Sequence, residues 1–452
     1  MKEFFFLMMF SAFFASAQSQ WSSCDDATFV GLSPQVLEVV DDTLIVGGFF
    51  NSVNNAGYDG IAKWNGQEWS DLPNSQGVED IVQYGDSIIF AGGFYEQLDN
   101  EECGAIGAFF NGEWKGLDGG ASSPSAIVSG VAVLGDQLIA VGSFNEMGGV
   151  ESLWRVAMWD GQSWNDIGGV SGFIGEPRKA VIYNGEIFIC GDFSLADGNV
   201  PSPNLARWNG SEWVEVLSGP SSTVLEIYPS IDHGYMYIGG LFTNIGGESS
   251  PGIAKFDGVN TFPISPVGFN DAANAICVYR DQIYAAGNFT QLSDGTEMNH
   301  ISRFDGVHWQ PLEGGIGGNV FDLAVYQDQL YAVGAIAWAG SEDFEIDGIA
   351  RWFMHPDSVT WGVPDHIGDI EFNERHITLF PNPGKSQCIV INESLIDGLL
   401  AITTSNGKEV LREPTCGRRE TELNISSLKS GVYLVHLIEQ GTIRATQRLI
   451  VE

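Results

Sequence analysis

One segment of about 48 residues recurs seven times along the chain and constrains the fold more than any other feature. In its clearest copy, Leu134 to Trp164, a Gly-Asp pair separates two apolar runs, and a polar loop and a third apolar run follow. Repetition at a nearly fixed period indicates one supersecondary unit used many times. One position is aromatic or Ile in every copy, with spacings of 45, 50, 49, 49, 47 and 47: Phe49, Phe94, Phe144, Phe193, Phe242, Phe289 and Ile336.

A second marker closes the third apolar run of each copy. It reads apolar residue, Ala, any residue, aromatic residue and then Asn-Gly or Asp-Gly, as in Val156 to Gly161. Such pairs between apolar runs predict type I′ hairpin turns, because both central residues need positive φ. A Trp then opens the predicted fourth strand, with Phe262 in its place in the fifth copy: Trp69, Trp114, Trp164, Trp213, Trp309 and Trp361.

The repeats predict an all-β protein whose residues 21–361 form a seven-bladed β-propeller of four-stranded blades. The segment that begins at Trp21 reads as a fourth strand without the first three, so we expect it to complete the last sheet and close the ring. Cys190 and Cys277 fall inside predicted strands and are expected to be small core residues. We interpret the recurring Trp residues as architecture, since one binding site would not need six copies.

Loop lengths indicate which face of the propeller binds a ligand. The links between first and second strands, and between third and fourth strands, are tight, so the longer links crowd the opposite face, where binding residues usually lie. Two acidic loops there are candidate ligand-binding or calcium-binding segments, because dense carboxylates supply hard oxygen ligands and a Trp can stack on a sugar. Their residues are Trp338, Glu342, Asp343, Glu345 and Asp347 in the seventh repeat, and Asp99, Glu101 and Glu102 in the second. The alternative is that both loops are solvated acidic surface.

Charge excludes one class of partner. Residues 4–375 carry 11 basic and 49 acidic side chains, whereas residues 376–452 are balanced, with 8 of each. A surface this acidic repels phosphate backbones, so we expect no nucleic-acid partner. No zinc-type His pairing, G-x-S-x-G elbow, phosphate loop or Cys-x-x-Cys pair occurs, so the sequence supplies no catalytic residues.

The first 17 residues read as a signal peptide. Lys2 precedes an apolar run from Phe4 to Phe14, and Ala15-Ser16-Ala17 provides the small residues of a cleavage site after Ala17. About eleven apolar residues are too few for a permanent transmembrane helix, which needs roughly 20, and no later stretch approaches that length. We therefore expect export and no transmembrane segment.

Beyond the repeats, residues 362–375 read as a polar linker, and residues 376–452 hold several short strands that predict a small β-sandwich. Cys388 and Cys416 both lie in this domain, so they could form a disulfide; the sequence leaves this open. The domain opens with the run Phe380, Pro381, Asn382, Pro383 and Gly384, and later contains Leu428-Lys429-Ser430-Gly431-Val432-Tyr433 and Leu449-Ile450-Val451.

Two resemblances follow from these residues. The repeats resemble bacterial kelch-like propeller blades, in which an apolar strand ends in Gly-Gly and a Trp comes later; Gly47-Gly48, Gly92-Gly93 and Gly239-Gly240 keep that pair. The tail resembles the C-terminal sorting domain of the type IX (Por) secretion system of Bacteroidetes, through its Phe-Pro-Asn-Pro opening and its Gly431 and Tyr433 motif. This second resemblance implies an Ig-like fold, contact with the outer-membrane secretion machinery, and release or surface attachment.

Two functional hypotheses remain open from the sequence. The first is an exported, non-catalytic protein that binds a glycan or a protein on the long-loop face, with calcium as a possible cofactor. The second is a secreted polysaccharide hydrolase or lyase whose carboxylates come from several blades, an arrangement that spacing along one chain does not reveal.

Overall fold

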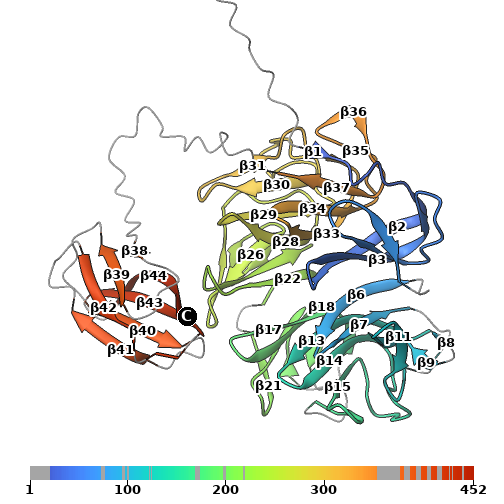
Figure 1. Cartoon of the computed structure of the whole chain (residues 1–452), viewed down its shortest axis with the longest axis horizontal. Helices are drawn as coiled ribbons and strands as arrows, with labels where there is room; N and C mark the ends of the chain where they lie inside the picture. Colours follow the sequence, from blue (N-terminus) through green and yellow to red (C-terminus); the bar gives the residue numbers. More distant parts are fainter. Residues whose placement is uncertain are drawn as a thin grey trace, which may run out of the picture. The chain divides into compact units, whose positions relative to one another are not determined.

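The computed structural model of the chain describes residues 21–451, except for 73–76, 94–96, 99–100, 122, 124, 168–173, 197–199, 217–218, 354–376, 381–386, 393–398, 405–408, 415–419, 427, 430 and 440–441. It divides into two compact units, a propeller and a smaller C-terminal unit. Every regular element among the described residues is a strand, so the predicted all-β class is confirmed (Figure 1).

Seven sheets form the propeller; the strands of the first six follow chain order, and the seventh takes its outermost strand from the N-terminal segment. The first three are β2 (Phe29–Val40), β3 (Thr43–Val53), β4 (Ile61–Trp64) and β5 (Trp69–Asp71); β6 (Val78–Tyr84), β7 (Ser87–Gly92), β10 (Ile106–Phe110) and β11 (Glu113–Gly116); and β13 (Ile127–Leu134), β14 (Gln137–Ser143), β15 (Val156–Trp159) and β16 (Trp164–Asn165). The next two are β17 (Ile174–Tyr183), β18 (Glu186–Ala196), β20 (Leu205–Trp208) and β21 (Trp213–Glu215), with β19 (Val200–Pro201) added beside β18; and β22 (Val224–Ser230), β23 (Tyr235–Gly240), β26 (Ile253–Phe256) and β27 (Thr261–Pro263). The last two are β28 (Ala273–Tyr279), β29 (Gln282–Gly287), β30 (Ile301–Phe304) and β31 (Trp309–Pro311); and β33 (Val320–Tyr326), β34 (Gln329–Gly334), β37 (Ile349–Trp352) and β1 (Trp21–Ser22).

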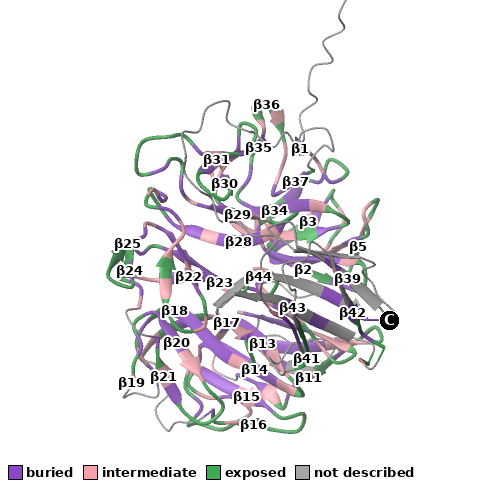
Figure 2. Cartoon of the chain, turned by 90° about the vertical axis from the view of Figure 1, so that its left-hand side faces the viewer, coloured by how far each residue is buried: buried purple, intermediate pink, exposed green. Residues whose placement is uncertain are grey.

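The first strands of neighbouring blades contact one another around the axis of the ring: β2 with β6, β6 with β13, β13 with β17, β28 with β33 and β33 with β2 (Figure 1). Each blade buries its apolar side chains against the next blade. Leu44 and Val46 of the first blade, for example, share one cluster with Tyr331 and Val333 of the seventh. The second strand of each blade has buried side chains on both faces of its sheet, where the blade packs against its two neighbours (Figure 2). The predicted seven-bladed architecture is confirmed.

The ring is closed by the N-terminal segment, as the sequence predicted. Trp21 pairs with Trp352 and Ser22 pairs with Arg351, so β1 is the outermost strand of the seventh sheet. The Arg351 Nε also donates a hydrogen bond of 2.8 Å to the Ser22 hydroxyl. Trp361, which the sequence placed in this position, lies outside the described residues.

The repeated aromatic residues are structural, although two of them were assigned one residue away. Phe50, not Phe49, is the marker of the first blade: its carbonyl accepts a hydrogen bond from the N–H of Gly60, as the carbonyl of Phe144 does from Arg155. Phe50 is fully buried and Phe49 is exposed. The doubled Phe hid this shift, because both residues fit an apolar pattern.

In the fifth blade, Thr261 occupies the Trp position. It pairs with Phe256, as Trp69 pairs with Trp64. Phe262 pairs with Lys255 instead and is exposed. Side chains alternate along a strand, so an offset of one residue turns this ring to solvent.

Most of the Asn/Asp-Gly pairs form a different turn from the one predicted. Asn111-Gly112 does take positive φ at both residues, at 52° and 85°. Of the Asp160-Gly161 pair in the third blade, only Gly161 has positive φ, and the Asp160 carboxylate accepts hydrogen bonds from the N–H groups of Gln162 and Ser163. Those two bonds lower the pKa of Asp160 and cap a longer loop. Other turns with positive φ at two successive residues lie between the first and second strands of several blades, as at Asn184-Gly185.

The C-terminal unit consists of two sheets that share one apolar core. One contains β38 (Ile377–Phe380), β39 (Gln387–Asn392) and β42 (Glu420–Asn424); the other contains β41 (Glu409–Pro414), β40 (Leu399–Thr404), β43 (Gly431–Glu439) and β44 (Thr442–Val451). Val390 and Leu423 from the first sheet pack with Leu400 and Val435 from the second. Two facing sheets agree with the sandwich expected from the sequence.

The motif residues of the tail are only partly described. Phe380 ends β38 and Gly431 begins β43. The Tyr433 ring is buried, and its hydroxyl donates a hydrogen bond of 2.9 Å to the carbonyl of Lys429. Pro381–Gly384 and Cys416 lie outside the described residues, as do Ala15 and Ala17, so the disulfide and the cleavage site stay predictions. Cys190 and Cys277 are buried free thiols, which confirms them as core residues.

Candidate ligand-binding site

The longer links of the propeller build small accessory sheets. These links join second to third strands within a blade, or one blade to the next. In the seventh blade β35 (Trp338–Ala339) and β36 (Ser341–Glu345) form a hairpin, and β32 (Ile316–Gly317) pairs with β35. The other accessory strands are β8 (Gln97–Leu98), β9 (Glu101–Gly104), β12 (Gly119–Gly120), β24 (Asn244–Ile245) and β25 (Glu248–Ser249). The face with long links therefore carries ordered loops.

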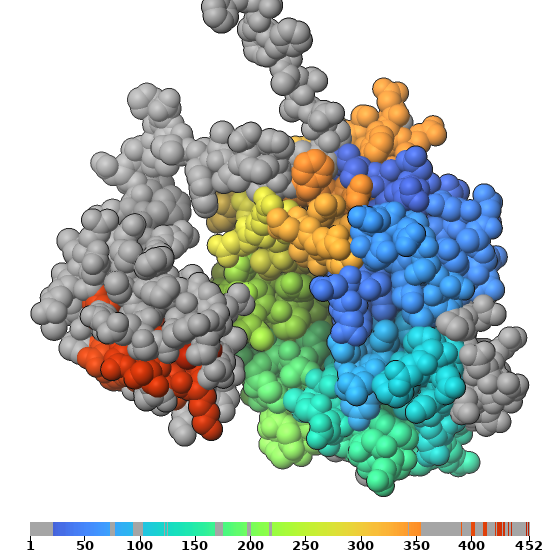
Figure 3. All heavy atoms as spheres, viewed as in Figure 1, coloured from blue at the N-terminus to red at the C-terminus, as the bar shows by residue number. Residues whose placement is uncertain are grey.

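A pocket of about 640 Å³ lies between two of these links, at the seam where the ring closes. One wall is the link from β1 to β2, and the other is the link from β34 to β37. Figure 3 shows the blue N-terminal segment beside the orange loop of the seventh blade. This volume is typical of a small-ligand site. The lining residues are Ser23, Asp26, Ala27, Thr28, Ile336, Ala337, Trp338, Glu345, Ile346 and Asp347.

Three of the residues predicted from sequence meet in this pocket: Trp338, Glu345 and Asp347. Asp343 is exposed in β36 and is not among the lining residues. For Glu342, Glu101 and Glu102 only the backbone is described, and Asp99 lies outside the described residues. Of the two predicted acidic loops, the seventh-blade loop thus contributes side chains to a cavity.

Asp347 joins the two walls. Its Oδ2 accepts a hydrogen bond of 3.1 Å from the N–H of Phe29, which is 318 residues away in the chain. Burial raises the pKa of this carboxyl group, and the Phe29 hydrogen bond opposes the shift. Gly348 follows with a φ of 72°, and a Cβ there would lie 2.9 Å from the Phe29 ring. The loop therefore needs glycine at that position to bring Asp347 against Phe29.

The indole of Trp338 packs against Gly317, its neighbour in the accessory sheet. Gly317 pairs with Trp338, and a Cβ on Gly317 would lie 2.0 Å from the indole Nε1 and 2.1 Å from Cε2. The indole thus packs over bare backbone that no other residue could provide. Trp338 is only partly buried and also lines the pocket, so it offers the ligand a fixed aromatic surface.

The pocket is acidic. Asp26, Glu345 and Asp347 contribute carboxylates, and no Lys, Arg or His is among the lining residues. The hydroxyl of Ser23 donates a hydrogen bond of 2.8 Å to Asp26, which holds that side chain on the N-terminal wall. Among the described residues, no three His, Cys, Asp or Glu side chains come together as a metal-binding set. The calcium expectation stays a prediction, because the side chain of Glu342 is not described.

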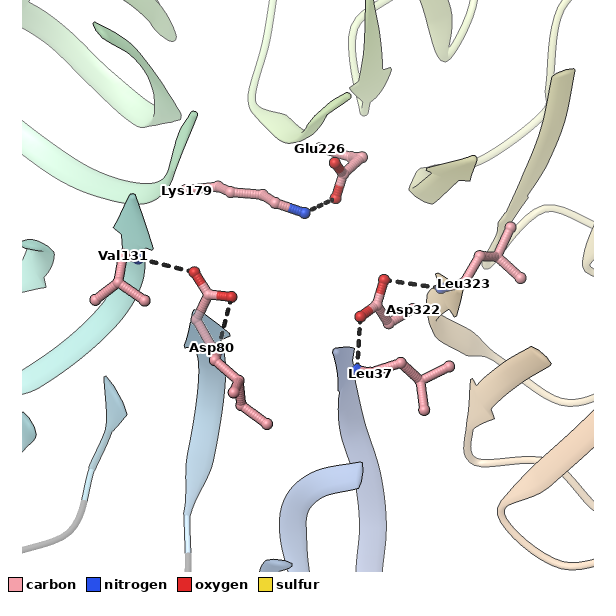
Figure 4. Close-up of polar contacts among 8 residues, drawn as sticks. Leu37, Asp80, Val131, Lys179, Glu226, Asp322 and Leu323 are labelled. Atoms are coloured by element: carbon pink, nitrogen blue, oxygen red, sulfur yellow. Dashed lines mark hydrogen bonds and ion pairs between the residues drawn. The ribbon is translucent and has the colours of Figure 1, made fainter. Parts of the chain in front are cut away.

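A second polar cluster, which the sequence reasoning missed, lies around the axis of the ring, where the first strands of the blades meet. We call Glu38, Asp80, Lys179, Glu226 and Asp322 the channel cluster. They come from the first strands of five blades, and Figure 4 shows the last four pointing toward one another. Asp80, Lys179 and Asp322 each follow a shift in the register of their strand, and Glu226 holds the equivalent position in the fifth blade. In chain order, the seven blades place these residues there: Val36, Asp80, Gly130, Lys179, Glu226, Ala275 and Asp322.

The channel cluster connects neighbouring blades. Asp80 accepts hydrogen bonds of 2.8 Å from the N–H of Val131 in the next blade and 2.9 Å from Ile81 in its own. Asp322 does the same with Leu37 at 2.8 Å and Leu323 at 2.7 Å, across the closure between the seventh and first blades (Figure 4).

Lys179 is the only cation of the cluster and pairs with Glu226 at 2.5 Å. The side chain of Glu226 is 5% exposed and that of Lys179 is 31% exposed. Burial raises the pKa of Glu38 to about 8, of Glu226 to about 7 and of Asp80 to about 6. Burial would lower the pKa of Lys179, but the charges of Glu226, Asp322 and Asp80 raise it overall. The ammonium group therefore stays charged.

These contacts limit what the channel cluster can do chemically. Both oxygens of Asp80 and of Asp322 accept main-chain N–H groups, and Glu226 is paired with Lys179. Such engaged groups hold blades together rather than reach a substrate. Aligning the repeats could have revealed the cluster, because Asp80, Lys179 and Asp322 each stand 14 residues before their marker residue in an otherwise apolar strand.

Comparison with known proteins identifies the tail. Residues 378–452 match the model of the secretion system C-terminal sorting domain. No curated protein matches the chain.

Solved structures with some likeness to the chain include two of low identity. One is described as the extracellular domain of a one-component system from B. thetaiotaomicron, with a TM-score of 0.45 and 11% identity over 93% of this chain and 56% of the other. The second is a gluconolactonase from Xanthomonas campestris, with a TM-score of 0.35 and 12% identity over 72% and 96%. The chain thus spans just over half the length of the first.

Among the described residues no helix has the length and apolarity that a membrane crossing requires. The C-terminal match confirms the sorting domain predicted from the Phe380 and Tyr433 motifs. The protein carries a type IX sorting domain behind a seven-bladed propeller, and it is secreted or attached to the cell surface.

Proposed function

We propose that this protein is an exported binding protein that takes a glycan or protein ligand in the pocket beside Trp338. The observation that carries the proposal is the convergence of Trp338, Glu345 and Asp347 in one cavity on the long-loop face. An immobilised aromatic surface with a few polar groups around it is a typical ligand site. The proposal includes a cleaved signal peptide, kelch-like repeats and a Bacteroidetes source, on the sequence motifs described above.

Rigidity of the site supports the proposal. Gly317 fixes the indole, and the Phe29–Asp347 hydrogen bond fixes the two walls, so binding need not order either loop. A preformed site loses less entropy when its ligand arrives. The hydrolase or lyase alternative has less support, because Asp80, Asp322 and Glu226, which the fold gathers from three blades, are engaged in contacts between blades.

The test is a glycan array and a peptide array, probed with the full mature chain with and without calcium. Trp338→Ala should abolish the captured signal. Trp154→Ala is the matched control, because Trp154 is 50% exposed and lies in the third blade, away from the pocket. Signal that survives Trp338→Ala would place the binding surface elsewhere, and equal loss in both variants would indicate non-specific adhesion.

A further inference from the structure

We propose that the ligand of this pocket carries a positive charge, as a guanidinium or ammonium group that lies against Trp338 and pairs with Asp347. The inference rests on the proposed binding function and names the chemistry of the ligand. Two sources share that chemistry: a basic side chain of a protein, and an amino sugar.

The charges of the lining exclude the opposite class of ligand. All three ionisable side chains in the lining, Asp26, Glu345 and Asp347, are carboxylates. A phosphate, sulfate or uronate group would meet no cation among the described lining residues and would be repelled by their carboxylates. A cation would be attracted, and the excess of acidic side chains over residues 4–375 would concentrate it at the surface.

Asp347 gives the cation a position. One of its oxygens is fixed by the N–H of Phe29, so the carboxylate is oriented before the ligand arrives. The group has lost part of its hydration, which is why its pKa is raised. A cation in hydrogen-bond contact with Asp347 would supply a counter-charge that the described lining residues do not provide. Hydrogen bonds between charged groups are stronger than those between neutral groups.

Trp338 provides the second contact. Cations bind over the face of an indole because the ring carries negative potential there. Gly317 supports the indole from one side. A guanidinium group can stack on such a ring and still reach a carboxylate through its edge. An ammonium on a sugar ring can do the same, with the pyranose stacked on the indole.

The test compares probes that differ mainly in charge, by calorimetry at 0.15 M salt, roughly the ionic strength of physiological media. A tri-arginine peptide with N-acetyl and C-amide ends is paired with the tri-citrulline peptide capped in the same way, and a glucosamine trimer with the N-acetylglucosamine trimer. We expect at least one charged probe to bind at least tenfold more tightly than its neutral counterpart. The charged probe that does so identifies the source.

The variants locate the binding. Asp347→Asn keeps a carbonyl oxygen for the Phe29 N–H but removes the charge, and it should lower the affinity for the charged probe at least tenfold. Asp86→Asn is the matched control, since Asp86 is an exposed residue of a tight turn on the opposite face. If Asp347→Asn and Asp86→Asn bind equally well, the attraction is the diffuse field of an acidic protein, and the inference is wrong.

The inference and the proposed function fail in different ways. Equal binding of charged and neutral probes, lost in Trp338→Ala, would overturn the charge requirement and leave the binding site in place. Absence of binding by every probe would overturn the inference, while capture on the arrays that depends on Trp338 would still support the function. Absence of any Trp338-dependent capture would overturn both.

Discussion

Lys179 is the cation of the channel cluster, and the buried carboxylates around it depend on its charge. Burying a carboxylate costs several kcal/mol unless a cation accompanies it. Here one ammonium accompanies Glu226 directly and stabilises Asp80 and Asp322 electrostatically. The ring therefore tolerates carboxylates at positions where other blades place Val36, Gly130 or Ala275.

Replacing Lys179 with Met should destabilise the propeller by about 3 kcal/mol, the lower end of the range for breaking a buried ion pair, because Lys179 keeps some solvent contact. Urea unfolding followed by fluorescence measures the change. The double variant Lys179→Met with Glu226→Gln removes the stranded charge and should recover part of the loss. A single variant as stable as the parent would show that the pair contributes nothing.

Stability should fall as pH rises from about 4.5 to about 8. Glu38 and Glu226 have folded pKa values of about 8 and about 7, above their usual value of 4.5. The folded state therefore binds more protons than the unfolded state in this window, and stabilisation present at acidic pH is lost as these groups ionise. Thermal midpoints between pH 4.5 and pH 9 measure the slope.

Glu38→Gln should flatten that curve above pH 6, because it removes the group that ionises last. Glu68→Gln, at an exposed position of the first blade, is the control and should leave the slope unchanged. A parent midpoint that rises steadily over the same window would contradict the assigned protonation.

At the scale of elements, the two-residue strand β1 closes the ring, and the β32–β35–β36 sheet positions Trp338. So short a strand suffices because Trp21 is 3% exposed and packs in the same core cluster as Leu330 and Trp352. The same closure brings the β1–β2 link against the seventh-blade loop. The pocket beside Trp338 thus results from the way in which the ring is closed.

Trp21→Ala should cost about 3–5 kcal/mol, the range for truncating a buried Trp. It should also weaken ligand capture at the pocket, since Ser23 to Thr28 are held in place by β1. Trp154→Ala, at an exposed site, should change stability by less than about 0.5 kcal/mol. Chemical denaturation measures both, and equal effects would mean that β1 does not seal the ring.

At the scale of the whole molecule, the acidic propeller and the charge-balanced tail are separate compact units, and the tail is the sorting domain. The tail has its own apolar core, with Leu400, Leu423 and Val435 fully buried, and residues 378–452 match a sorting domain. The propeller has core clusters of its own, and each unit is compact by itself. Export and ligand binding should therefore be separable.

Deleting residues 376–452 should leave a folded propeller that remains in the periplasm, while a reporter fused to those residues should leave the cell. Cell fractionation and a thermal melt of the truncated chain measure the two effects. Finding the truncated chain outside the cell would refute the role of the tail in sorting.

The sequence by itself determined the number of blades, the buried Trp pattern and the sorting tail, because turns, alternation and terminal motifs are local properties of the chain. It assigned Phe49 and Phe262 one position away from the sites that the structure gives to Phe50 and Thr261, because Phe49 and Phe50 look alike in one dimension and Phe262 is the aromatic residue beside a Thr. Only the tertiary structure decided the pocket and the contacts that the channel cluster makes. The pocket and one of those contacts depend on closing the ring, which places Phe29 against Asp347 and Leu37 against Asp322. Those partners are hundreds of residues apart, and no local pattern records which loops a closed ring will bring together.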